Sequence, residues 1–172
     1  MGNTLIKKFN EMAKFTHVKI ITNPSSGNRN AVFTGCSNLE ELDTVNITSI
    51  SGGAGITGTN SAPLYGTKIK ELNFPNLTYW GNYSLRTNNT LKKVTIGTKL
   101  TSVGGQGTNN VKNCAILINT ITPPTGETLV RNSSTNTGTY IYVPDDSYDA
   151  YYASSVFTNW KSYLRRMSAY TG

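Results

Sequence analysis

The chain has 172 residues, a formal net charge of +7 and only 15% charged residues. That length is enough for one domain with its own core, and the 10 Tyr and 2 Trp supply aromatic side chains to bury, which excludes a disordered tail. Because no stretch approaches the 18 apolar residues of a membrane span, and because the dispersed Lys and Arg accompany no nucleic-acid-binding motif, we expect neither a transmembrane helix nor nucleic-acid binding.

Residues 1–17 are predicted to form an amphipathic helix. Its apolar face recurs at the 3.6-residue helical spacing: Leu5, Ile6, Phe9, Met12 and Ala13. Such a helix either shields one end of a core or lies on a membrane or a partner. Its regularly spaced charges do not fit a secretory signal, so we expect a cytosolic chain, part of a longer secreted chain, or a virion component.

Residues 18–139 are predicted to form a repeat array. A short strand over residues 18–22 and a turn come first, and an apolar pattern then recurs with equivalent positions at Leu39, Ile69, Leu91 and Leu117. These positions are 30, 22 and 26 residues apart, a period that is typical of leucine-rich repeats. We therefore expect a β-rich, irregular leucine-rich-repeat solenoid with short strands such as 39–43 and 91–96 on one side and mostly loops on the convex side.

The two cysteines occupy equivalent places in this pattern. Cys36 and Cys114 each lie three residues before a repeat leucine, and no C-x-x-C motif is present. A cysteine in such a place packs as a small apolar residue, so we expect two buried free thiols.

Residues 140–172 are predicted to form a cap of a strand followed by helix. Residues 140–143 have the composition of a strand, a helix runs through Tyr148 and Ala153, and a second helical pattern spans 160–167. Asp145 and Asp146 follow a proline at the start of the first helix, where acidic residues favour helix initiation over a metal or acid pair.

Three of these segments together resemble the BspA-like leucine-rich-repeat family, whose members are frequent in gut Bacteroidetes and their phages. The segments are Phe33-Thr-Gly-Cys36-Ser-Asn-Leu39, the Thr-Pro-Pro-Thr break at 122–125, and Ile141-Tyr-Val-Pro144 through Tyr151 with the later Trp160. The resemblance covers about residues 33–167. It implies a right-handed solenoid with a surface or virion binding role and without catalytic residues.

The residues that an enzyme would need are scarce. His17 is the single histidine, and neither a G-x-S-x-G motif nor a phosphate-binding glycine loop occurs around Gly52–Gly55 or Gly104–Gly107. Glu40 and Glu41 alternate across the predicted strand and are therefore not expected to face one cleft. We accordingly predict no catalytic residue, no cofactor, no metal site and no enzymatic activity.

A binding role is the remaining prediction. The aromatic cluster of Tyr79, Trp80 and Tyr83 is the candidate binding site for a protein or glycan, since Tyr and Trp dominate binding hot spots. Trp80 has an alternative place in the core between two repeats. The expected role is adhesion or recognition at a bacterial surface, outside the cell. The alternative is a structural virion part that docks through its N-terminal helix, and unpaired edges would allow an oligomer.

Overall fold

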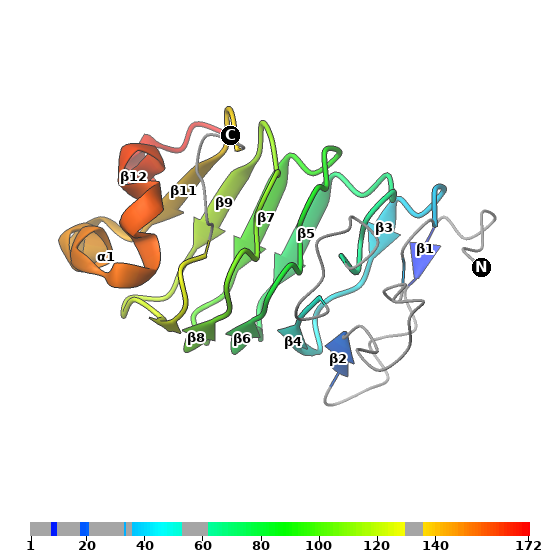
Figure 1. Ribbon diagram of the computed structural model, residues 1–172, viewed down its shortest axis with the longest axis horizontal. Helices are drawn as coiled ribbons and strands as arrows, with labels where there is room; N and C mark the ends of the chain where they lie inside the picture. The colour runs from blue at the N-terminus through cyan, green and yellow to red at the C-terminus, as the bar shows by residue number, and fades with distance from the viewer. Residues whose placement is uncertain (1–7, 10–17, 21–32, 34–35, 53–61, 130–135) are drawn as a thin grey trace.

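The structure is a computed structural model that describes residues 8–9, 18–20, 33, 36–52, 62–129 and 136–172. The chain alternates between two parallel β-sheets, as Figure 1 shows. Sheet I contains, in spatial order, β5 (Glu71–Phe74), β7 (Lys93–Ile96), β9 (Ala115–Ile118), β11 (Tyr140–Val143) and β12 (Leu164–Arg166). Sheet II contains β2 (Val18–Ile20), β4 (Ile47–Ile50), β6 (Tyr79–Trp80), β8 (Ser102–Val103) and β10 (Thr125–Gly126). A separate parallel pair joins β1 (Lys8–Phe9) to β3 (Glu41–Leu42).

The expectation of a leucine-rich-repeat solenoid is wrong. The fold belongs to the α/β class, with two parallel sheets and, among the described residues, one short α-helix. The side that was expected to carry mostly loops instead carries the whole of sheet II. The physical reason is composition, because β-branched threonines favour a pleated backbone while Asn and Gly disfavour helix.

The N-terminal helix is also wrong where the structure describes it. Lys8 and Phe9 form strand β1, which pairs with Glu41 and Leu42 of β3 in parallel. The strand predicted over 18–22 is present as β2. The rest of the predicted helix, including His17, lies outside the described residues.

The two sheets share one core. Along sheet I, alternate residues are buried, and the inward set is Leu72, Phe74, Val94, Ile96, Ile116, Ile118, Ile141, Val143 and Leu164. These side chains belong to the same hydrophobic cluster as Ile50 and Trp80 of sheet II. Full burial of each aliphatic side chain contributes roughly 2 kcal/mol of transfer free energy. Because burial alternates along each strand, the residues between these buried ones face outward from sheet I.

Leu117 does not point into the core, although the repeat prediction made it equivalent to the buried Leu39. It pairs with Thr95 in β7 and lies half-buried on the outer side of sheet I, while its neighbours Ile116 and Ile118 are fully buried. The predicted equivalence of Leu117 with Leu39, which is fully buried, is therefore wrong. Both cysteines are buried free thiols, as predicted.

Threonines connect the successive segments that lead into sheet II. The hydroxyl of Thr78 donates to the carbonyl of Thr48 at 2.9 Å, and that of Thr101 donates to the carbonyl of Thr78 at 3.0 Å. Thr125 continues the row toward Thr101 at 3.4 Å. Each backbone N–H in the row bonds to the same carbonyl as the hydroxyl. This doubled bonding explains why threonine recurs at positions 78, 101 and 125.

A buried asparagine holds the turn before β7. Asn88 is 2% exposed, and its Nδ2 donates to the carbonyl of Leu64 at 3.1 Å. Its Oδ1 accepts from the backbone N–H groups of Thr90 and Leu91, each at 3.1 Å, and from the Thr90 hydroxyl at 2.8 Å. A buried polar side chain with this many partners replaces the water that it loses on burial.

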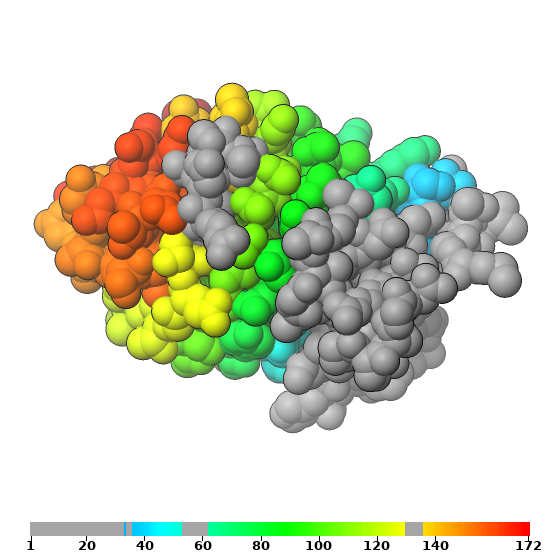
Figure 2. All heavy atoms as spheres, in the orientation of Figure 1, coloured from blue at the N-terminus to red at the C-terminus, as the bar shows by residue number. Residues whose placement is uncertain are grey.

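The C-terminal residues lie at one end of the molecule, beside β11, as Figure 1 shows, and form the orange and red end of the space-filling view in Figure 2. The strand predicted at 140–143 is β11, and the first predicted helix is α1 (Tyr148–Ala153), after the 3₁₀ helix η4 (Asp145–Ser147). The second predicted helix, over 160–167, is present only in part: residues 160–163 belong to the 3₁₀ helix η5 (Ser155–Tyr163), whereas strand β12 follows at once and leads into the 3₁₀ helix η6 (Met167–Ala169). The pairing of β12 with β11 supplies the backbone hydrogen bonds that a helix would otherwise provide.

Candidate functional site

The outer face of sheet I carries a row of side chains from four neighbouring strands. Register places Glu71 beside Lys93, Lys93 beside Ala115, and Ala115 beside Tyr140. The next outward row contains Asn73, Thr95, Leu117, Tyr142 and Arg165. Since parallel strands hold register neighbours about 4.8 Å apart, residues that are distant in the sequence form one surface.

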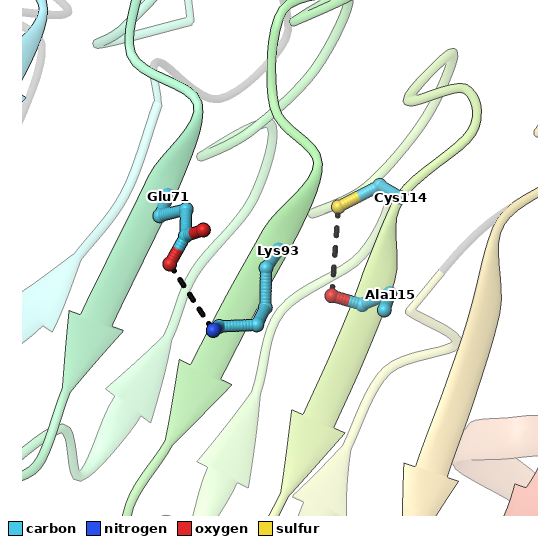
Figure 3. Close-up of polar contacts among 4 residues, drawn as sticks. All are labelled: Glu71, Lys93, Cys114 and Ala115. Carbon is cyan, nitrogen blue, oxygen red and sulfur yellow. Dashed lines mark hydrogen bonds and ion pairs between the residues drawn. The ribbon is translucent and has the colours of Figure 1, made fainter. Parts of the chain in front are cut away.

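An ion pair crosses this face between β5 and β7. Lys93 Nζ lies 3.1 Å from a carboxylate oxygen of Glu71, as Figure 3 shows. The hydrogen bond that the Lys93 ammonium donates to Glu71, followed by the negative charge of Glu71, raises the pKa of Lys93. Because both side chains are exposed to solvent, the pair contributes little to stability. Its effect is to orient the two charges on the face.

Tyrosines form the opposite side of the face. Tyr142 meets Tyr170 edge to face, with ring centroids 5.1 Å apart. The guanidinium of Arg165 lies over the ring of Tyr140, 4.7 Å from its centroid. These contacts restrict the rings while leaving both Tyr140 and Tyr142 part-exposed. Restrained aromatic rings at a surface lose little conformational entropy when a ligand packs on them.

A hollow of about 550 Å³ lies between the ion pair and the tyrosines. Small residues, among them Ala115 and Gly138, leave this space open. Lys92, Lys93 and the three residues Tyr140, Tyr142 and Tyr170 surround it. Its volume falls in the range of small-molecule and sugar-sized ligand sites.

Cys114 also lines this hollow, but it is not suited to nucleophilic chemistry. The thiol is 2% exposed, and its Sγ donates weakly to the carbonyl of Ala115 at 3.6 Å, as drawn in Figure 3. Burial raises the pKa of Cys114 to about 12, against a small opposing effect of Lys92. A thiol that stays protonated at neutral pH is a poor nucleophile.

A second hollow, of about 570 Å³, lies on the far side of the ion pair. Polar groups from the β3 and β5 segments line it, including Asp43, Thr44 and Asn73, together with Thr95 of β7. Glu40 and Glu41 line a third, adjoining hollow with Lys68 and Lys70. The expectation that these two glutamates would not face one cleft is therefore wrong, because β3 begins at Glu41 and Glu40 precedes the pleated strand.

The three aromatic residues predicted as a binding site do not form one exposed cluster. Trp80 is fully buried, so its side chain occupies the core, which was the alternative place for it. Tyr79 is half-buried in β6 of sheet II, and Tyr83 lies in the following turn with a φ of 55° and Arg86 over its ring. Neither tyrosine lines the three hollows of sheet I.

Asp145 ties two parts of the C-terminal cap together. Its carboxylate accepts a hydrogen bond of 3.0 Å from the backbone N–H of Ser168, and its backbone carbonyl accepts one of 2.6 Å from Arg166. The bond from Ser168, more than the nearby Arg166, lowers the pKa of Asp145. Asp145 and Asp146 lie in the first turn of η4, as predicted for acidic residues at a helix start, and the bond to Ser168 is an additional role of Asp145.

Within the described ranges, no group of three or more His, Cys, Asp and Glu side chains is arranged to hold a metal ion. Of the helices in that part of the chain, none has the length and apolar character needed to cross a membrane.

Comparison of this chain with protein-family models, with characterised proteins and with solved structures finds no match. The geometry on the outer face of sheet I therefore carries the functional argument.

Sequence reasoning missed the tyrosines of this face. Tyr140 and Tyr142 are two residues apart on a strand, a spacing that places both on one side. This spacing can be found in the sequence, but the prediction of a cap over residues 140–172 assigns no binding role to the two tyrosines. The proximity of Tyr170 and Lys93 was not available, since it depends on how the last residues fold back over sheet I.

Proposed function

We propose that this protein is a non-enzymatic recognition module that binds a glycan on the outer face of sheet I. The observation that supports the proposal is the hollow of about 550 Å³ with Tyr140, Tyr142 and Tyr170 on one side and Lys92 and Lys93 on the other. Sugar rings pack their C–H faces on aromatic rings, while charged and amide side chains bond to their hydroxyls. The arrangement of aromatic rings beside a few polar groups is typical of ligand sites.

The surroundings favour binding over catalysis. Burial keeps the thiol of Cys114 protonated, and Glu71, the one acidic side chain that lines the tyrosine hollow, is paired with Lys93. Hydrolysis of a glycosidic bond commonly uses two carboxylates that flank the bond.

We also propose that the protein acts outside the cell, at a bacterial surface or in a virion. Kinship with the BspA-like proteins is likewise a proposal, supported by the sequence motifs alone.

A glycan array and whole-cell binding with the full chain test the proposal. Replacing Tyr142 with Ala removes a ring that is part-exposed and contributes to the hollow. We expect at least about a tenfold loss of affinity, corresponding to about 1.4 kcal/mol, with the unfolding midpoint nearly unchanged.

The matched control is Tyr79→Ala, which removes a tyrosine of similar exposure from sheet II. It should leave binding unchanged. If Tyr79→Ala or Tyr83→Ala removes binding and Tyr142→Ala does not, the site lies elsewhere and the proposal for sheet I is wrong. Absence of any saturable glycan binding by the unaltered chain would contradict the function itself.

A further inference from the structure

The middle of the chain contains cationic residues but no acidic ones. No Asp or Glu occurs between Glu71 and Glu127, and this interval contains five cationic residues: Arg86, Lys92, Lys93, Lys99 and Lys112. The central strands β7 and β9 of sheet I lie in that interval. One of the five, Lys93, lies on the outer face of β7, and its register neighbour on β5 is the acidic Glu71.

Two exposed lysines stand next to each other on this surface. Lys70 and Lys92 directly precede the register partners Glu71 and Lys93, and both side chains are exposed. Lys93 is engaged by Glu71, whereas the ammonium groups of Lys70 and Lys92 make no ion pair with any side chain in the described ranges. Lys92 also lines the tyrosine hollow. A cation without an internal partner is available to an anionic ligand.

We infer that the ligand of this face is a glycan with carboxylate groups, such as a uronic or sialic acid oligosaccharide; the inference depends on the proposed glycan-binding function. A sugar ring on Tyr142 and Tyr170 places its substituents toward Lys92 and Lys93 across the same hollow. A carboxylate at that side gains a charge-assisted hydrogen bond, which is stronger than one between neutral groups.

The charge at the other end of the face favours a short acidic glycan over a nucleic acid. Glu40, Glu41 and Asp43 lie beyond Glu71 and line the adjoining hollows. A continuous polyanion that ran across the strands would meet these carboxylates, and like charges repel. A short oligosaccharide confined to the tyrosine hollow avoids them.

The test compares glycans in matched neutral and carboxylated pairs, for example galactose against galacturonate oligomers, and lactose against sialyllactose. We expect the carboxylated member of the bound pair to bind more tightly, and its affinity to fall as salt rises from about 50 to about 300 mM. Lys92→Gln should weaken the carboxylated member by about tenfold and the neutral member by much less, because the glutamine amide can still bond to a sugar hydroxyl while it cannot pair with a carboxylate.

Two further variants sharpen the result. Lys99→Gln removes the same charge from a lysine whose Nζ bonds to Asn76 at 2.8 Å, away from the hollow, and should change neither affinity. Glu71→Gln releases Lys93 from its ion pair and removes a negative charge, so it should raise the affinity for the carboxylated glycan several-fold.

The outcomes are separable. Equal affinity for neutral and carboxylated members, abolished by Tyr142→Ala, would overturn the inference and leave the glycan-binding function in place. No binding to any glycan would overturn both. Saturable binding of single-stranded DNA that displaces the glycan and is lost in Lys92→Gln would assign the face to nucleic acid and overturn the inference.

Discussion

Replacement of Asn88 by Ala tests how much one buried polar side chain stabilises the fold. The substitution removes all four hydrogen bonds of the amide, to the carbonyl of Leu64, the backbone N–H groups of Thr90 and Leu91, and the Thr90 hydroxyl. Two of these partners keep other bonds. The Leu64 carbonyl still accepts from Thr67, and the Thr90 hydroxyl still reaches the carbonyls of residues 67 and 69.

The backbone N–H of Leu91 bears the largest share of the loss. Leu91 is fully buried, so its N–H is left without a partner at a cost of roughly 2 kcal/mol, and the remaining bonds add about 1 kcal/mol. We therefore expect Asn88→Ala to lower the free energy of unfolding by about 3 kcal/mol. With a urea m-value of about 2 kcal/mol/M, the midpoint should fall by roughly 1.5 M.

Urea unfolding followed by circular dichroism measures this loss. Asn89→Ala is the control, because the adjacent side chain is exposed and makes no hydrogen bond in the described structure, and it should change stability by less than about 0.5 kcal/mol. A loss below about 1 kcal/mol for Asn88→Ala, or equal losses for the two variants, would refute the reasoning from buried hydrogen bonds.

Two further predictions concern the backbone and the buried thiol. Gly97→Ala should lower the free energy of unfolding by at least about 2 kcal/mol in the same urea assay, because the new Cβ meets the backbone of Pro75. Gly105→Ala meets only the movable carboxylate of Glu127 and should lower it by less than half as much. Similar losses for the two variants would contradict this reasoning. Burial raises the pKa of Cys114 from 9.0 to about 12 in the folded state. Between pH 9 and about 12, the thiol is therefore deprotonated in the unfolded chain and still protonated in the folded protein. The free energy of unfolding should therefore fall as pH rises through that window, more steeply than in Cys114→Ala, and parallel pH profiles would exclude the effect.

The amino-acid pattern predicted several features correctly. The strand at 140–143, the helix through Tyr148 and the burial of Cys36 and Cys114 all follow from local sequence. These features depend on residue type and on short-range periodicity, which act within a few residues. The spacing of Tyr140 and Tyr142 likewise predicts that both side chains lie on one side of a strand, which is one part of the outer face of sheet I.

The fold class could not be predicted from residue type and short-range periodicity. The apolar spacing predicted a leucine-rich-repeat solenoid, but the segments between the apolar positions are rich in Thr, Asn and Gly, and this composition does not distinguish a loop from a short strand. Thr78 and Thr101 directly precede β6 and β8 of sheet II, and their backbone and hydroxyl groups bond to the carbonyls of Thr48 and Thr78. That contact is between residues 23 or more positions apart and is invisible locally.

The sequence by itself determined which segments are apolar, that Cys36 and Cys114 are buried, and that charge is sparse. Tertiary structure alone decided which side of a strand faces inward, as the apolar residues 115–118 illustrate: pairing with Val94 and Ile96 turns Ile116 and Ile118 to the core and Leu117 outward. It also decided that Trp80 is buried and that Lys93, Tyr142 and Tyr170 surround one hollow. The physical reason is that register is set by hydrogen bonds between strands, and a shift of one residue would exchange the two faces.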